Sequence, residues 1–216
     1  MESLMCEVFS WNWSGIIPSI TGMITVYIAY LALTSWKKQH KSQRVTKFLD
    51  ELTDSIHELV QCINVPTQHL MMIHIGLESY KYNTDLNKEL AYPEAVSFIE
   101  KEGKEYSERL NETLESCEKT VHKLRSLLVK GQVYGIKNYN DCQNSCNKII
   151  WQFDRLQVVS IILGNRNRNW EHPKVIKQIK TLLEINPESI GDYLNENQKE
   201  FMKFVKNAYE NEYSNA

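Results

Sequence analysis

The longest uncharged stretch of the chain lies near its beginning, from Val8 to Trp36, although 24% of all residues are charged. Its core, Gly15 to Trp36, has 22 residues. As a helix rising about 1.5 Å per residue, this core would cover about 33 Å, enough for the hydrocarbon layer of a bilayer. The pattern predicts a short extracytoplasmic segment at residues 1–14, a transmembrane helix at residues 15–36 and a helical domain at residues 37–216.

After this run, apolar residues recur at alternating spacings of four and three, which is the period of one helix face. The first such stripe comprises Val45, Leu49, Leu52, Ile56, Leu59 and Ile63. It is predicted to end at Val65-Pro66, because the residue before a proline avoids helical angles. Further helices are predicted at about 67–82, 93–130, 141–163, 174–184 and 189–210. We expect an all-α fold, a single N-terminal transmembrane helix followed by a cytoplasmic antiparallel helical bundle, partly coiled-coil-like.

The residues on either side of the apolar run predict its orientation. Indole rings prefer the headgroup zone of a bilayer, and basic residues are retained on the cytoplasmic side. Glu2 and Glu7 precede the run, whereas five basic residues follow it between Lys37 and Lys47. We therefore expect the N-terminus outside and the helical domain in the cytoplasm, at a bacterial inner membrane. The predicted membrane-interface residues are Trp11, Trp13, Trp36, Lys37, Lys38, Lys41 and Arg44.

The run has two other interpretations, a cleaved signal peptide and a buried core helix. A cleaved signal peptide has a positively charged start and a shorter apolar core, and this chain has neither. A buried core helix does not account for the flanking tryptophans and lysines.

Gly15, Ser19 and Gly22 are small residues near the outer end, and such residues let helix backbones approach closely, so they are candidates for self-association. Small residues are also common in transmembrane helices that do not associate.

Composition and cysteine spacing argue against disulfide and metal chemistry. The five cysteines are Cys6, Cys62, Cys117, Cys142 and Cys146, an odd number with scattered spacing, so we expect reduced thiols for the last four. Cys142 and Cys146 continue an apolar stripe and are predicted to pack in the core. No cofactor is expected, and no small-molecule substrate is evident. Residues 37–216 contain 25 basic and 25 acidic residues, so no overall charge excess favours nucleic acid.

One polar segment has candidate chemistry, Gly164 to Pro173. Arg166, the polar Asn167 and then His172 after five residues resemble the motif of the HEPN family of all-helical RNA-cleaving domains. The resemblance implies that His172 acts as general acid or base on a ribose hydroxyl, that Arg166 steadies phosphate charge, and that Asn167 orients them. Nucleic acid would then contact Arg166, Arg168, Trp170, Lys174 and Lys177. The alternatives are a basic loop that touches anionic lipid headgroups and a solvated turn.

Three functions follow from these patterns. The first is a single-pass, membrane-anchored helical interaction protein that anchors, senses or relays without catalysis, with the bilayer and a protein partner or a second copy as its partners. The second is a membrane-tethered, HEPN-like, metal-independent ribonuclease that uses Arg166 and His172. The third is a toxin-like or defence effector that acts through an oligomerising membrane helix.

Overall fold

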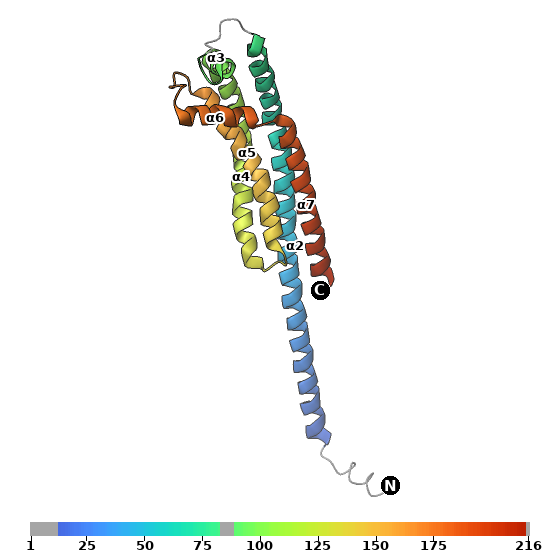
Figure 1. Cartoon of the computed structure of the whole chain (residues 1–216). Helices are drawn as coiled ribbons and strands as arrows, with labels where there is room; N and C mark the ends of the chain where they lie inside the picture. Colours follow the sequence, from blue (N-terminus) through green and yellow to red (C-terminus); the bar gives the residue numbers. More distant parts are fainter. Residues whose placement is uncertain (1–12, 83–88, 215–216) are drawn as a thin grey trace.

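The computed structural model describes residues 13–82 and 89–214. Within these residues there are six α-helices and no strand, so the all-α prediction is confirmed. Four long helices run alternately up and down and form an antiparallel bundle (Figure 1). These four are α2 (Trp13–Ser79), α4 (Gly103–Gly131), α5 (Tyr139–Gly164) and α7 (Pro187–Ser214). The shorter elements are α3 (Pro93–Lys101), α6 (Pro173–Glu184) and two 3-10 turns, η1 (Tyr80–Tyr82) and η2 (Gln132–Tyr134).

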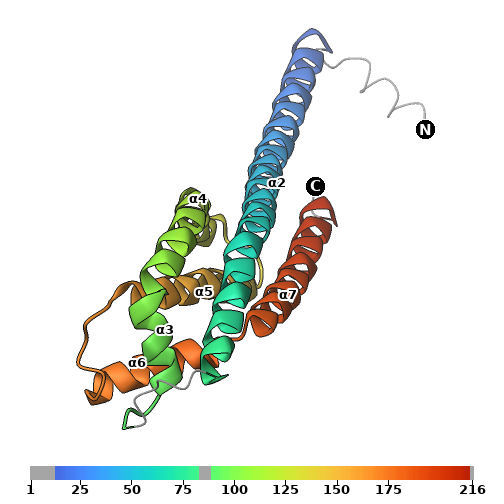
Figure 2. The ribbon, with the colours of Figure 1, turned by 90° about the horizontal axis from the view of Figure 1, so that it is seen from above.

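Only the second half of α2, from Val45 to Ser79, belongs to the bundle; the first half, from Trp13 to Arg44, is called the exposed half. In Figures 1 and 2 the first half extends alone beyond the other helices, and α3 and α6 lie at the opposite end. The predicted stripe from Val45 to Ile63 lies in the core, and each of its six residues is no more than 1% exposed. Burying such a side chain contributes about 1.5–3 kcal/mol, so this face holds α2 against its neighbours. The coiled-coil detail stays a prediction.

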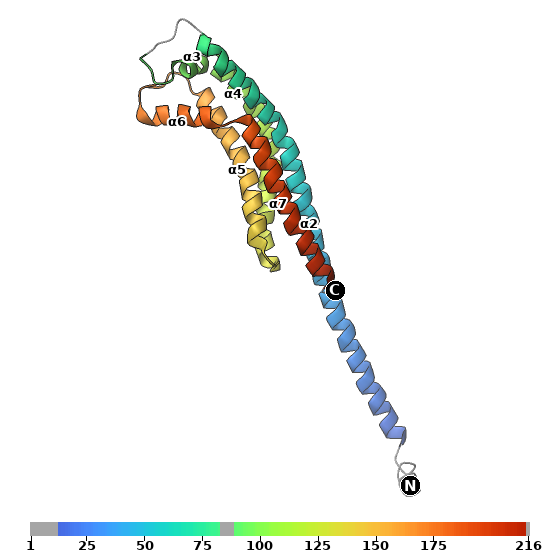
Figure 3. The same cartoon turned by 45° about the vertical axis from the view of Figure 1, so that its right-hand side comes forward.

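The predicted helix end at Pro66 is wrong, because α2 continues through this proline to Ser79. A proline inside a helix costs about 3 kcal/mol, since it removes a backbone hydrogen bond and crowds the preceding turn. Leu70, Ile73 and Leu77 beyond it are 0–4% exposed, and burying three such residues at about 1.5–3 kcal/mol each outweighs that cost. The hydroxyl of Thr67 also donates to the carbonyl of Ile63 at 2.8 Å. Figure 3 shows α2 curving over the bundle, as helices that contain proline commonly do.

The single helix predicted over 93–130 is also wrong, because the chain breaks into α3 and α4 at Glu102. Glu102 has φ −120° and ψ −17°, outside the helical range. The next residue, Gly103, is packed so closely that a Cβ there would lie 2.6 Å from the carbonyl oxygen of Leu163. The hydroxyl of Tyr80 donates to Glu102 at 2.7 Å, and burial together with this bond raises the pKa of Tyr80 to about 12. The break lets α4 cross α5 at close range.

The expectation of four reduced thiols is wrong for Cys62 and Cys117, which form a disulfide between α2 and α4. Their Cα atoms are 5.7 Å apart although 55 residues separate them in the sequence. Closing a loop of that length lowers the conformational entropy of the unfolded chain, which stabilises the folded protein by about 4 kcal/mol in the loop-entropy model. Cys142 and Cys146 are free and buried, as predicted. Spacing alone could not reveal the pair, because it forms only when two distant helix turns meet.

Candidate functional site

The exposed half of α2 is the first candidate site. Among the described residues this is the one helix long and apolar enough to cross a membrane, and none of its apolar window is buried in the molecule. The large side chains from Ile20 to Trp36 are between 46% and 70% exposed. Burying each of these side chains in an apolar environment would contribute about 1.5–3 kcal/mol, and no other part of the described chain covers them. The buried-core interpretation of the run is therefore wrong.

Five of the predicted interface residues, Trp36, Lys37, Lys38, Lys41 and Arg44, lie where the exposed half of α2 approaches the bundle. Trp36 is 59% exposed and stacks on His40, with the ring centroids 5.5 Å apart. Lys37, Lys38, Lys41 and Arg44 follow it on the exposed surface of α2, before the first core residue, Val45. We call Lys37, Lys38, Lys41, Arg44 and Lys47 the basic collar. α2 begins at Trp13, whose side chain lies outside the described part of the structure, as do the surroundings of Gly15, and Trp11 lies outside the described residues altogether.

The predicted self-association face is open in the single chain. Ser19 is exposed, and a Cβ added at Gly22 would meet no atom within 4 Å. A second helix can therefore approach this side without displacing any part of the same chain. Gly76, on the buried half of the same helix, is the opposite case, because a Cβ there would lie 2.6 Å from the ring of Phe98.

The segment with the HEPN-like motif forms a loop between α5 and α6. The guanidinium of Arg166 donates to the carbonyl of Lys101 at 3.4 Å, and Asn167 adopts a left-handed backbone with φ 58°. Nδ1 of His172 accepts from the backbone N–H of Lys174 at 3.2 Å and so caps the first turn of α6. Within the described residues, no hydrogen bond joins Arg166 to His172. The catalytic roles assigned to these residues stay a prediction.

The neighbouring loop residues also have structural partners. The indole N–H of Trp170 donates to Glu100 on α3 at 2.6 Å. Arg168 donates to the side-chain oxygen of Gln178 at 2.5 Å, and burial lowers the pKa of its guanidinium. Lys174 and Lys177 lie exposed on α6. The loop is therefore tied to α3 and α6, and the guanidinium of Arg168 is engaged in one of these contacts.

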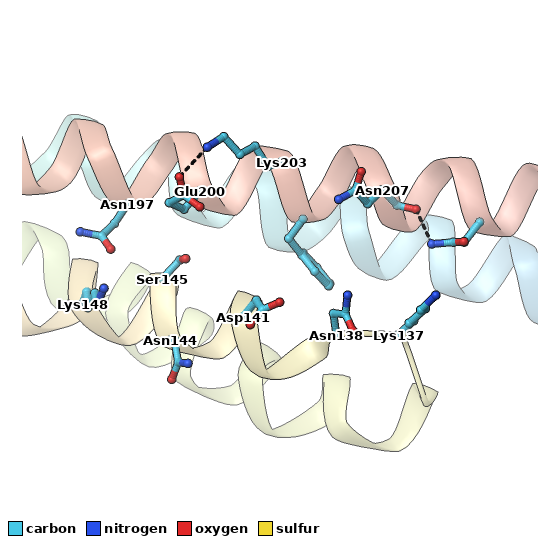
Figure 4. Close-up of a pocket in the computed structure, with 12 residues that line it drawn as sticks. Lys137, Asn138, Asp141, Asn144, Ser145, Lys148, Asn197, Glu200, Lys203 and Asn207 are labelled. Atoms are coloured by element: carbon cyan, nitrogen blue, oxygen red, sulfur yellow. Dashed lines mark hydrogen bonds and ion pairs between the residues drawn. The ribbon is translucent and has the colours of Figure 1, made fainter.

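A polar groove of about 380 Å³ runs between α5 and α7. Figure 4 shows Asn197, Ser145 and Lys148 near one end, and Asn207, Asn138 and Lys137 near the other. Ser145 and Asn197 are 7% and 4% exposed, and the amide of Asn197 donates to the carbonyl of Tyr193 at 2.7 Å. Lys203 pairs with Glu200 at 2.6 Å. The lining offers hydrogen-bonding groups and both signs of charge, without a nucleophile held beside a general base.

The buried titratable groups do not form a reactive centre. The sulfur atoms of Cys142 and Cys146 are 3.9 Å apart, and hydrogen bonding between them together with burial raises the pKa of Cys146, which keeps a thiol unreactive. His74, on the buried half of α2, has its Nε2 atom buried without a partner, and burial lowers its pKa. In the parts of the chain that the structure describes, no group of three or more His, Cys, Asp or Glu residues is placed to hold a metal ion.

Comparison with protein-family models, with curated proteins and with solved structures found no match for this chain.

Proposed function

We propose that this is a single-pass, membrane-anchored helical interaction protein that holds its bundle beside the inner face of a bacterial inner membrane and acts by anchoring, sensing or relaying. The observation that carries the proposal is that one uninterrupted helix, α2, forms both the exposed apolar segment and a wall of the bundle core. Any partner that holds the bundle is thereby linked to the membrane through a rigid element.

The orientation is part of the proposal. The basic collar follows the apolar segment at once, and the positive-inside rule assigns that side to the cytoplasm. The Cys62–Cys117 disulfide argues for the opposite side, because disulfides persist in oxidising compartments. We propose the orientation that the collar indicates, because the basic residues act when the helix inserts. The Cys62–Cys117 bond does not fix the orientation, because two cysteines at bonding distance become oxidised or reduced according to the thiols around them.

Membrane extraction tests the anchor. The protein is expected to stay with the membrane pellet in alkaline carbonate and to leave it only in detergent. The measured mass of the membrane-bound protein is expected to equal that of a chain that still contains the apolar segment. Release by carbonate, or a mature chain lacking residues 15–36, would contradict the proposal, the second by identifying a cleaved signal sequence.

Protease protection tests the orientation independently. In right-side-out spheroplasts the bundle is expected to resist added protease, and in inverted vesicles it is expected to be digested down to the spanning segment. A cytoplasmic and a periplasmic marker protein serve as controls for vesicle orientation. Digestion in intact spheroplasts would place the bundle outside and make the disulfide a permanent one.

A further inference from the structure

The hairpin of α4 and α5 changes charge along its length. Residues 100–118 contain seven glutamates, whereas residues 119–140 contain five basic residues and neither aspartate nor glutamate. Those five are Lys119, Lys123, Arg125, Lys130 and Lys137. The chain turns from α4 into α5 inside this basic segment. Figures 1 and 3 place the turn at the end of the bundle from which the exposed half of α2 emerges, so this basic turn lies on the side of the predicted membrane.

The tip of the hairpin is apolar as well as basic. Val129 and Val133 are 66% and 87% exposed, and Lys130 and Lys137 lie exposed beside them. In the described part of the chain, neither lysine has an acidic partner within ion-pair distance. Exposed apolar side chains next to unpaired lysines are typical of surfaces that lie on anionic lipid headgroups.

The height of the tip above the membrane follows from its contacts with α2. Tyr134 in the turn stacks on Phe48, with the ring centroids 4.8 Å apart. Phe48 follows Trp36 by twelve residues, or about 18 Å along the helix axis. Transmembrane helices tilt by about 20° on average and by up to about 40°. A tip displaced sideways by one helix spacing of about 8–10 Å would stand about 14 Å above the level of Trp36 when α2 tilts toward the hairpin by about 20°, and about 8 Å above it at a tilt of about 40°. Tilts near that upper end therefore bring the turn within a Debye length of about 8 Å of the headgroups.

We propose that the α4–α5 turn, residues 129–137, docks on the anionic headgroups of the leaflet beside it. Lys130 and Lys137 face the lipid phosphates, and Val133 enters the interface. The proposal rests on the proposed function, because it requires α2 to be inserted in the bilayer. It goes beyond the basic collar, whose residues lie near the membrane wherever the bundle points, whereas docking of the turn fixes the tilt and rotation of the whole bundle.

Tryptophan quenching by brominated lipid tests the docking. Full-length V133W would be placed in nanodiscs of phosphatidylcholine alone or mixed with phosphatidylglycerol, with the unaltered protein subtracted to remove its own tryptophans. The matched control is V65W, because Val65 is an exposed valine, 49% exposed, on the bundle half of α2 beyond the disulfide turn. Brominated lipid is expected to quench V133W in the phosphatidylglycerol discs several-fold more than in phosphatidylcholine, and to leave V65W unquenched in both.

Charge reversal tests the role of the lysines. Each basic residue near an anionic surface strengthens binding about five-fold, so K130E/K137E in the V133W background is expected to weaken docking by at least roughly 25-fold and to abolish the extra quenching. K174E/K177E, on α6 at the other end of the bundle, is the matched control and is expected to leave the quenching unchanged. Circular dichroism of each variant would establish that the helices are intact.

Each contrary outcome has a distinct meaning. Equal quenching of V133W and V65W, or quenching independent of phosphatidylglycerol, overturns the docking. Binding of a fluorescent RNA oligonucleotide that needs Lys130 and Lys137, without quenching of V133W, assigns the surface to nucleic acid and also overturns it. Failure of the protein to enter nanodiscs overturns the proposed membrane anchor itself, whereas incorporation without quenching overturns only the docking.

Discussion

The two halves of α2 share one backbone geometry and lie in opposite surroundings. From Ile20 to Trp36 the large apolar side chains are 46–70% exposed, whereas the inward residues from Val45 to Leu77 are no more than 4% exposed. The first half is apolar on all sides, which suits a helix surrounded by lipid, and the second is apolar along one stripe, which suits a helix packed on others. The width of the apolar surface therefore indicates which surroundings each half requires.

The largest expected effect follows from a cavity in the buried half. Leu59→Ala is expected to lower the free energy of unfolding by about 2–5 kcal/mol, because Leu59 is fully buried and the neighbouring helices cannot close around the space. Leu33→Ala, at a residue 48% exposed in the other half, is expected to leave it unchanged. Urea unfolding in detergent, followed by circular dichroism, measures both. Equal losses would show that the two halves do not differ in their surroundings as described.

The disulfide sharpens the comparison by tying only the buried half to the bundle. C62S/C117S is expected to lower the free energy of unfolding by about 2–4 kcal/mol relative to the oxidised protein. With the bundle in the cytoplasm, cells quenched with N-ethylmaleimide are expected to show both thiols alkylated, and air oxidation of unquenched lysate is expected to form the bond. Finding the pair fully oxidised in quenched cells would instead place the bundle in an oxidising compartment.

The two α2 glycines with known surroundings provide a matched pair. Gly76→Ala is expected to cost about 1–3 kcal/mol, because its Cβ would lie 2.6 Å from the ring of the fully buried Phe98. Gly22→Ala meets nothing within 4 Å and is expected to leave bundle stability unchanged. Unfolding curves report both variants.

If sedimentation in detergent shows that Gly22→Leu lowers the association state, the small-residue face mediates pairing. If the effector hypothesis holds, Gly22→Leu rather than His172→Ala relieves growth arrest on overexpression.

The pH dependence of stability is expected to reflect His74 on the buried half. Burial lowers its pKa in the folded protein below the value of 6.5 in the unfolded chain, so the unfolded state binds more protons as the pH falls. The free energy of unfolding should therefore decrease as the pH drops through the unfolded pKa toward the lower folded one. His74→Gln is expected to remove that slope in urea titrations at several pH values. An unchanged slope would assign it to another group.

The smallest effect is expected at His172. His172→Ala removes the acceptor that caps α6 and is expected to cost about 0.5–2 kcal/mol. The interaction-protein hypothesis expects no RNA cleavage by either the unaltered protein or this variant. The ribonuclease hypothesis expects metal-independent cleavage that both His172→Ala and Arg166→Ala abolish with the fold intact. A gel assay with labelled RNA in the presence of a chelator separates the two.

The periodic segments of this protein were predictable because each depends on neighbours along the chain. The stripe from Val45 to Ile63 and the helices around it follow from the spacing of apolar residues within a few turns. The candidate site was predictable only as a set of residue types. The loop at 164–173 was visible as Arg, Asn and His, but the contacts that engage Arg166 with Lys101 and His172 with Lys174 were not. The basic, apolar hairpin tip was missed, although the absence of acidic residues over 119–140 was a signal in the sequence that could have found it.

By itself, the sequence determined the apolar segment with its basic collar and the helical character of the remainder, because hydrophobicity, charge and helix period are properties of short stretches. The tertiary structure alone decided that α2 continues through Pro66, that the chain breaks at Glu102, and that Cys62 meets Cys117. Each of these depends on groups that are distant in the sequence and become neighbours only when the helices pack. The helix continues through Pro66 because the side chains beyond it are buried against other helices, the break precedes Gly103 because that residue packs on the backbone of Leu163, and the disulfide needs a second sulfur from another helix.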